Sequence, residues 1–185
     1  LHTLHDVAVR PRGLLPGVDH SLHELLDRPG HAAYAPCTAE QLAGRGYAYW
    51  ALGHVHAREI VGRDPWIVFP GNLQGRDMGE TGAKGATLVT VRDGGIAEVQ
   101  HRVLDVVRFA RTEVSLSGAE DEDAAFSRAH SAIAGALRAA EHRLLAVRCV
   151  LQGATRAHGA LSRNLADTRE KLRNTILAAG GGDSV

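Results

Sequence analysis

Short apolar runs alternate with stretches rich in glycine, proline and charge, and this pattern predicts small strands before residue 111 and helices after it. Apolar and aromatic residues at 47–52 and 66–69 predict two short strands, the second of which is ended by a Pro-Gly pair. Two further β-rich runs flank an Asp-Gly-Gly stretch at 93–95, which is the signal for a tight hairpin. We therefore expect antiparallel strands to close a sheet in the first part of the chain.

The segment before these strands is irregular apart from one helix signal. Residues 4–30 contain several prolines and glycines, which predict a surface loop with about two helical turns at 19–27. Thr38 followed three residues later by Gln41 forms a capping-box pattern, and glycines at 44 and 46 end the helix that it starts. A short helix is thus expected to lead into the first strand.

After residue 111 the spacing of apolar residues changes to three and four. An acidic group at 120–123 precedes this segment, and we interpret it as helix-start electrostatics, a metal site being the alternative. The apolar positions of the expected helix are Phe126, Ala129, Ile133, Leu137, Ala140 and Leu144. A strand at 144–153 follows, and Leu161, Leu165, Leu172 and Ile176 mark a last helix that ends in glycines 180–182. The pattern predicts a helix, strand, helix unit.

Composition excludes several classes of protein. With 185 residues and 44% apolar content, the chain can bury one core, or one core and part of a second. Lys and Arg equal Asp and Glu in number, so net charge gives no sign of a nucleic-acid binder. Two distant cysteines disfavour a disulfide scaffold and a zinc ribbon. The cysteine usage also makes a reducing cytoplasm the expected compartment. The longest apolar runs are too short to span a bilayer, so we expect no membrane segment.

The most informative short motif is a pair of histidines, His54 and His56, behind Gly53. In an extended segment, side chains two residues apart project to the same side, about 6.6 Å apart along the chain. The ions of a two-metal hydrolase site lie about 3.5–4 Å apart, so the two imidazoles could each serve a different ion. The alternative is a chance pair that satisfies hydrogen bonds, because the chain has eleven histidines.

Five stretches of the sequence favour the metal-site interpretation of the histidine pair, because they occur together and in a characteristic order. They are "LHT" at 1–3, "YAPCTAEQL" at 34–42, "GYAYWALGHVH" at 46–56, "FPGNLQGRDMGETGAKG" at 69–85 and "LDVVRFA" at 104–110. The combination resembles the calcineurin-like metallophosphoesterases, and within them the SbcD/YhaO branch of DNA repair exonucleases. "AVRCVLQGATRAHGAL" at 146–161 is similar to the capping domain that this branch carries.

The resemblance implies an α/β (α+β) fold in two parts. Residues 1–111 would be the C-terminal half of a metallophosphoesterase domain, part of a β-sandwich flanked by helices. Residues 112–185 would be a partial capping domain, a small αβα segment. The implied activity is hydrolysis of phosphodiester bonds at DNA ends with two divalent metal ions, manganese being the expected metal. The implied partners are DNA and an SMC-like ATPase of the SbcC/YhaN type, with a homodimer as a further expectation.

The same resemblance assigns roles to individual residues. His2 and His54 would be ligands of one ion and His56 a ligand of the other, while Asn72 and Arg76 would lie near the substrate phosphate. His31 is a substitute for His2, and the other N-terminal histidines, His5, His20 and His23, are weaker candidates. For Arg76, Glu80 and Lys84, turn and sheet-edge structure is the competing interpretation.

Departures from the family pattern are equally informative. The family's Asp-x-His, bridging Asp and Asn-His-Asp motifs are not in this sequence, which begins with Leu1 rather than methionine. We therefore expect half of a metal site, with the acid/base histidine and the carboxylates in a preceding segment of a larger domain.

Two other functions stay open. One is a phosphoesterase of the same fold that acts on small phosphoesters, favoured by the neutral charge. The other is a non-catalytic module that docks a partner through an apolar patch at 161–177. A zinc site built from Cys37, Cys149 and the histidine pair is a minor alternative, and Trp50 and Trp66 are expected in the core rather than as base-stacking platforms.

Overall fold

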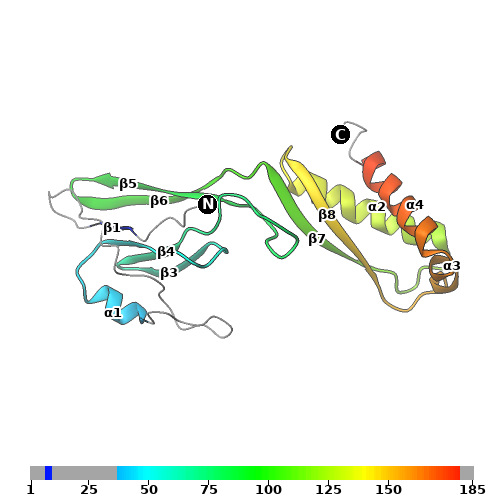
Figure 1. The fold of residues 1–185 in the computed structure, drawn as a ribbon, viewed down its shortest axis with the longest axis horizontal. Coiled ribbons are helices and arrows are strands. Elements are labelled where there is room, and N and C mark those ends of the chain that lie inside the picture. Colours follow the sequence, from blue (N-terminus) through cyan, green and yellow to red (C-terminus); the bar gives the residue numbers. More distant parts are fainter. Residues whose placement is uncertain (1–6, 10–36, 180–185) are drawn as a thin grey trace. The chain divides into compact units, whose positions relative to one another are not determined.

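The structure, a computed structural model, describes residues 7–9 and 37–179, which fall into two compact units (Figure 1). Unit 1 comprises Leu1–Gln74 and Lys84–Leu104, and unit 2 comprises Gly75–Ala83 and Asp105–Val185. The expected boundary after residue 111 lies inside a strand of unit 2, and the assignment of domain identities stays a prediction.

Unit 1 contains a four-stranded sheet in the order β1-β2-β4-β3. The strands are β1 (Val7–Val9), β2 (Tyr49–Ala51), β3 (Glu59–Arg63) and β4 (Trp66–Phe69). β2 and β4 run parallel, whereas β1 pairs antiparallel with β2 and β3 with β4. The prediction of a loop was therefore wrong at β1, where β-branched valines favour pairing with β2. β3 was not predicted, while β4 is confirmed with the bounds expected.

A hairpin and one short helix complete unit 1. β5 (Gly85–Arg92) and β6 (Gly95–Val103) pair antiparallel, as predicted, around a two-residue turn. Asp93 and Gly94 in that turn both have positive φ, 50° and 78°, which matches the right-handed twist of the flanking strands. Helix α1 (Ala39–Ala43) has the predicted capping box, because the Gln41 amide donates to Thr38 Oγ1 and the Thr38 amide donates to Gln41 Oε1.

The core of unit 1 lies on β2 and β4. Trp50 is only 1% exposed and packs with other buried residues, namely Leu42, Leu52, Ile67 and Phe69. This confirms Trp50 as a core aromatic. Trp66 is half-buried, with the Arg63 guanidinium 4.9 Å from its ring centroid.

Unit 2 is built from two parallel strands and three helices. β7 (Val107–Ser115) and β8 (Leu144–Gln152) pair over nine residues, and α2 (Glu122–Ala139) connects them. α3 (His158–Arg163) and α4 (Leu165–Ala179) follow. Buried alanines and Ile133 of α2, together with Val114 of β7 and Leu161 of α3, provide the core.

Several expectations for this unit are corrected by the structure. β7 was not predicted as a strand, so the expected helix, strand, helix unit in fact begins with a strand. The expected last helix is two helices, because Asn164 has non-helical backbone angles (φ −137°, ψ 84°). Leu144 begins β8 rather than extending α2. The acidic group does start α2, since the Asp121 carboxylate accepts a hydrogen bond from the Ala124 amide at 2.8 Å.

The chain is thus a mixed α/β protein with small sheets and helices. The β-sandwich that the resemblance implies stays a prediction. Within the described ranges, 7–9 and 37–179, no helix combines the length and the apolar character that a membrane crossing requires.

Candidate functional site

The candidate site lies at the carboxyl edge of the parallel pair β2 and β4. Because the two strands run parallel, the loops that follow them leave from the same edge of the sheet. The loop after β2 carries Gly53, His54 and His56, and the loop after β4 is Pro70–Asn72. Segments that the sequence separates by about a dozen residues are therefore neighbours here.

The backbone of the histidine loop differs from the extended segment that we expected. His54 has φ of +67°, a left-handed conformation that L side chains adopt rarely. The Val55 amide donates to the Gly53 carbonyl at 2.8 Å, which closes a tight turn around His54. The argument that both side chains share one side of a strand is therefore wrong in its premise. Both histidines are nevertheless exposed, as metal ligands open to solvent would be.

Main-chain contacts hold the two loops together. The Asn72 amide donates to the His56 carbonyl at 3.1 Å, and the Gly85 amide donates to the Asn72 carbonyl at 3.1 Å. Gly71 has φ of +76°, and a methyl group added there would lie 2.8 Å from the Arg58 nitrogen and 2.9 Å from the His56 oxygen. Only glycine allows this approach. The structure thus brings the main chains of His56 and Asn72 together, while the roles that the resemblance assigns to their side chains stay predictions.

The described residues do not by themselves form a complete metal centre. No group of three or more His, Cys, Asp or Glu side chains in the part of the chain that the structure describes is arranged to hold an ion. This also leaves the zinc alternative without support from those residues. His2, His31, His5, His20 and His23 lie outside the described residues. Among the described residues, the candidate metal ligands of this site are the imidazoles of His54 and His56.

Arg58 is a cation next to this site that the sequence analysis did not single out. It follows His56 by two residues, and its main chain packs against Gly71. Its Nε atom is buried and has no hydrogen-bond partner among the described residues. Tyr49 lies near it on β2, and burial raises the pKa of that phenol while the charge of Arg58 lowers it. In the sequence, the observation that could have pointed to Arg58 is its position two residues after His56 of the histidine motif.

Arg76 lies in unit 2, in the loop Gly75–Ala83, rather than in the unit that holds the histidines. Its guanidinium donates to Glu80 Oε1 at 2.8 Å and 3.1 Å, and its amide donates to Glu80 Oε2 at 2.9 Å. This hydrogen bonding raises the pKa of Arg76. The contacts support the interpretation that Arg76 and Glu80 fix a turn. Lys84, at the start of the hairpin, is buried.

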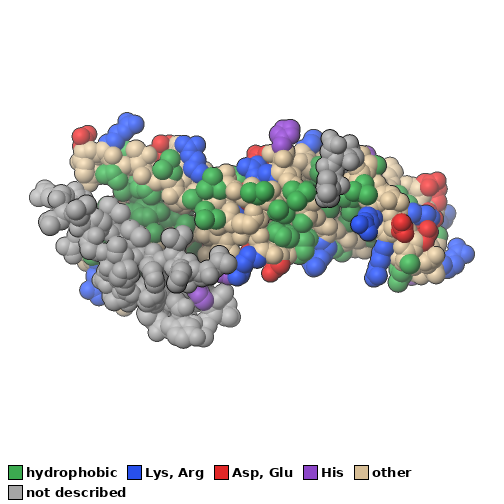
Figure 2. All heavy atoms as spheres, turned by 45° about the horizontal axis from the view of Figure 1, so that its top comes forward, with side chains coloured by type: hydrophobic (Ala, Val, Ile, Leu, Met, Phe, Trp, Pro, Cys, Tyr) green, Lys and Arg blue, Asp and Glu red, His purple; other side chains and the backbone are tan. Residues whose placement is uncertain are grey.

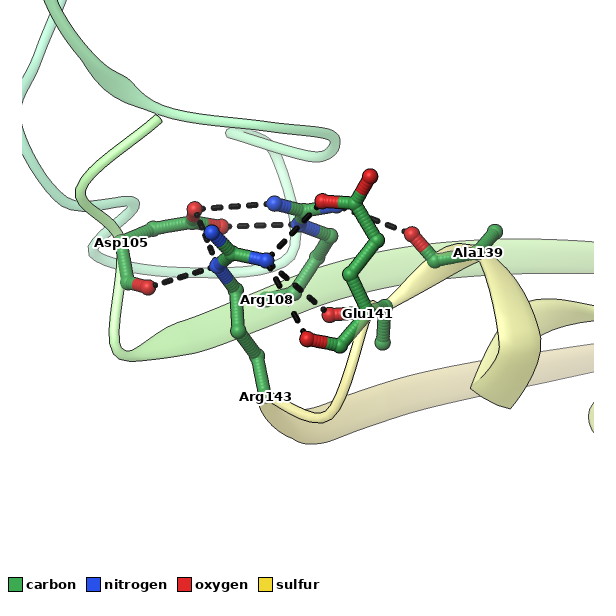
Figure 3. Close-up of polar contacts among 6 residues, drawn as sticks. Asp105, Arg108, Ala139, Glu141 and Arg143 are labelled. Atoms are coloured by element: carbon green, nitrogen blue, oxygen red, sulfur yellow. Dashed lines mark hydrogen bonds and ion pairs between the residues drawn. The ribbon is translucent and has the colours of Figure 1, made fainter. Parts of the chain in front are cut away.

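A buried charge network at the start of β7 also escaped the sequence analysis (Figure 3). The Asp105 carboxylate, fully buried, accepts from Arg108 Nε at 2.8 Å and from Arg108 Nη2 at 2.9 Å. Arg143 Nε lies 3.1 Å from the same carboxylate and donates to the Asp105 carbonyl at 3.0 Å. The hydrogen bonds from Arg108 hold the pKa of Asp105 below its usual value of 3.8.

The same network joins three segments of unit 2. Arg108 Nη1 donates to the Ala139 carbonyl at 2.9 Å, so a cation also stabilises the C-terminus of α2. Arg143 binds the Glu141 carboxylate at 2.9 Å in the turn before β8. The network therefore fixes the start of β7 against the end of α2 and the start of β8. Its partners already satisfy it, so we regard it as structural.

Comparison with known proteins agrees with the resemblance. Residues 109–185 match the family described as "Metallophosphoesterase YhaO, middle domain". The chain is also 39% identical over 98 residues to the "Uncharacterized metallophosphoesterase YhaO" of Bacillus subtilis (strain 168). That alignment covers 52% of this chain and 24% of the relative, so the chain spans about a quarter of the length of the protein it matches. No solved structure matches the chain.

Proposed function

Starting from the premise that this chain is a distant homologue of the YhaO metallophosphoesterase, we propose that it belongs to a metal-dependent nuclease that hydrolyses phosphodiester bonds at DNA ends. The observation that carries the proposal is the junction of two loops at one sheet edge. There the His56 carbonyl and the Asn72 amide are joined by a hydrogen bond, beside two exposed histidines.

The histidines are the proposed ligands of two divalent ions, with manganese as the expected metal. His54 would serve one ion, together with His2 from outside the described residues, and His56 would serve the other. Such a pair of ions stabilises the attacking and leaving oxygens of an in-line displacement. Carboxylate ligands and the acid/base histidine would have to come from other parts of the whole protein.

The residues of this chain have a positioning role in the proposal. The tight turn at Gly53–Val55 and the bond from Asn72 fix the main chain on both sides of His56. A ligand whose backbone is held in this way loses little conformational freedom when it binds. Asn72 would place its side-chain amide near a phosphate oxygen of the substrate. Arg76, engaged by Glu80, has a weaker claim to the same task.

The test is manganese-dependent digestion of linear duplex DNA by the whole protein. His54→Ala and His56→Ala should each lower the rate by at least about 100-fold, because outer-shell partners of metal ligands already contribute about 10- to 100-fold. His130→Ala, which removes an exposed histidine from α2, is the matched control and should leave the rate unchanged. Activity retained in both site variants would contradict the assignment.

A small phosphoester as substrate is the second candidate, because the formal net charge is zero. The two functions differ in their dependence on salt. Binding through DNA phosphates weakens steeply between about 50 and 200 mM salt, because counterions are released. Turnover of a small phosphodiester should change little over this range. A salt-independent KM together with poor DNA cleavage would favour the small substrate.

An SMC-like ATPase is the proposed partner of the nuclease, and a homodimer is proposed as its assembly. The name of the relative mentions neither. Co-purification of the whole protein with the ATPase, and its mass by light scattering, would test both. If the whole protein binds such a partner but binds no metal and cleaves no phosphoester, the non-catalytic module is the better description.

A further inference from the structure

In unit 2, helices cover one face of the sheet, while the loop Gly75–Ala83 reaches the other face at Phe109, whose ring lies beside Gly75. Val114, Cys149 and Leu151 face the helices, where they pack in the core with residues of α2 and α3. Because side chains alternate along a strand, the odd-numbered residues of β7 and the even-numbered residues of β8 face the other way. We call this the open face. Parallel sheets normally have both faces covered, so an open face on a parallel pair predicts a missing layer.

One end of the open face carries an exposed hydrophobic residue. Leu144, the first residue of β8, is 57% exposed. Leu144 pairs with Val107, and the next pair on this face is Phe109 with Ala146. Figure 2 shows hydrophobic side chains at the surface of the molecule beside Lys and Arg side chains. An apolar layer would pack against this end of the open face.

Two arginines lie directly opposite each other in the middle of the open face. The register pairs Arg111 with Arg148, and both are exposed. Arg111 lies 3.2 Å from the Glu113 carboxylate, while no acidic side chain in the described part of the chain forms an ion pair with Arg148. Like charges directly opposite across two strands are destabilising. An unfavourable pair of like charges of this kind often marks a surface that binds a partner of the opposite charge.

We propose that the open face docks an acidic amphipathic helix of a partner protein. Its apolar residues would cover Leu144, Ala146 and Val150, and its Asp or Glu side chains would reach Arg111 and Arg148. A helix is the layer that completes a parallel sheet. This role does not depend on the proposed phosphodiester hydrolysis, which uses the histidine loop of unit 1.

A protein helix explains more of the surface than a nucleic acid does. A phosphate backbone would satisfy the two arginines but would leave Leu144 in contact with a charged ligand. The helices of a second copy are poor occupants, since α2 buries Ala125, Ala129 and Ile133 in its own core. α4 likewise packs on α2 through its buried Thr168 side.

The test measures binding of a labelled synthetic helix to the whole chain by fluorescence anisotropy. The probe is a peptide of about 18 residues, with leucines three and four positions apart and glutamates beside them. A second peptide has lysine in place of every glutamate. The glutamate peptide should bind, and the lysine peptide should bind at least about tenfold more weakly, because charge complementarity is lost.

Matched variants locate the binding surface. Arg111→Glu combined with Arg148→Glu should raise the Kd of the glutamate peptide at least about tenfold. Arg169→Glu combined with Arg173→Glu makes the same charge change on exposed positions of α4 and should alter the Kd less than about twofold. Leu144→Ser should weaken binding without any change of charge.

Three outcomes would overturn the proposal. One is no binding of the glutamate peptide, and another is equal loss of binding in both double variants. The third is selective loss of affinity for a DNA duplex in the Arg111 and Arg148 variant with peptide binding unchanged, which would make the open face a nucleic-acid surface. Circular dichroism of each variant shows whether unit 2 is still folded.

Discussion

The described residues include two parallel strand pairs, and the edges of these pairs differ. At the carboxyl edge of β2 and β4, main-chain hydrogen bonds and a glycine contact join the loop that carries the exposed His54 and His56 to the loop after β4. At the amino edge of β7 and β8, the buried Asp105 carboxylate binds Arg108 and the half-buried Arg143. The first edge exposes the candidate metal ligands to solvent, whereas the second edge holds charges that stabilise the fold.

This difference shows how to separate a candidate site from a structural charge cluster. A charged side chain whose partners all come from its own fold has little capacity left for a ligand. Asp105 meets this description, because it is fully buried and engaged by two arginines. The histidine loop is fixed through its backbone, and its two histidine side chains are exposed, so a ligand in solution can reach them.

The largest effect is expected from Asp105→Asn. This change leaves the Arg108 and Arg143 guanidinium groups without their carboxylate, and breaking a buried ion pair in this way costs about 3–5 kcal/mol. Urea unfolding followed by circular dichroism measures it. Glu141→Gln is the matched control, because the Glu141 side chain is 64% exposed and such pairs contribute at most about 1 kcal/mol. Equal effects of the two changes would mean that burial does not set the energy of the network.

The next effect concerns the backbone contact at the candidate site. Gly71→Ala should destabilise unit 1 by about 2–4 kcal/mol, because the left-handed conformation costs a side chain about 1–2 kcal/mol and the clash adds a similar amount. Gly46→Ala is the control, since Gly46 has nearly the same φ, +75°, and no atom within 4 Å of an added methyl group. It should cost only the conformational part. A Gly71 variant as stable as the Gly46 variant would argue against the close approach of the loops.

A pH titration sharpens the contrast between the two edges. Because the folded-state pKa of Asp105 is lowered, its contribution to stability is present above the unfolded-state pKa near 3.8 and is lost as pH falls through the folded-state value. The urea concentration at the unfolding midpoint of the wild-type protein should therefore decrease as the pH is lowered below about 5. Asp105→Asn should show a smaller dependence in this range. A parallel decline in the variant would assign the acid sensitivity to other carboxylates.

The smallest effect is expected from Arg76→Ala. Its partner Glu80 is largely buried, but the Arg76 side chain is 63% exposed, so the pair should contribute about 1 kcal/mol or less. If Arg76 only fixes the turn, KM for the substrate of the whole protein should not change. An increase in KM with unchanged stability would instead support the phosphate contact that the resemblance implied.

Features set by local chemistry could be predicted from the sequence. The capping box of α1 involves residues three apart, and the turn of the β5–β6 hairpin needs only Asp93 and Gly94. The acids before α2 act within its first turn. In each case the interacting groups are close in sequence, so composition and spacing are sufficient.

Features that depend on distant partners could not be predicted in this way. β7 is stabilised by a parallel register with β8, which lies beyond an entire helix, and Arg143 reaches Asp105 across 38 residues. The candidate site was predicted from the order of its motifs, not from its geometry. The left-handed backbone at His54 has no local signal, because histidine does not specify positive φ.

The most direct test of the central claim, that the histidine loop holds metal, is the stoichiometry of manganese binding to the whole protein, measured by isothermal titration calorimetry or electron paramagnetic resonance. We expect two ions per wild-type chain, loss of at least one tight site in His54→Ala and in His56→Ala, and unchanged binding in His130→Ala. Undiminished binding of both ions by the two site variants would contradict it.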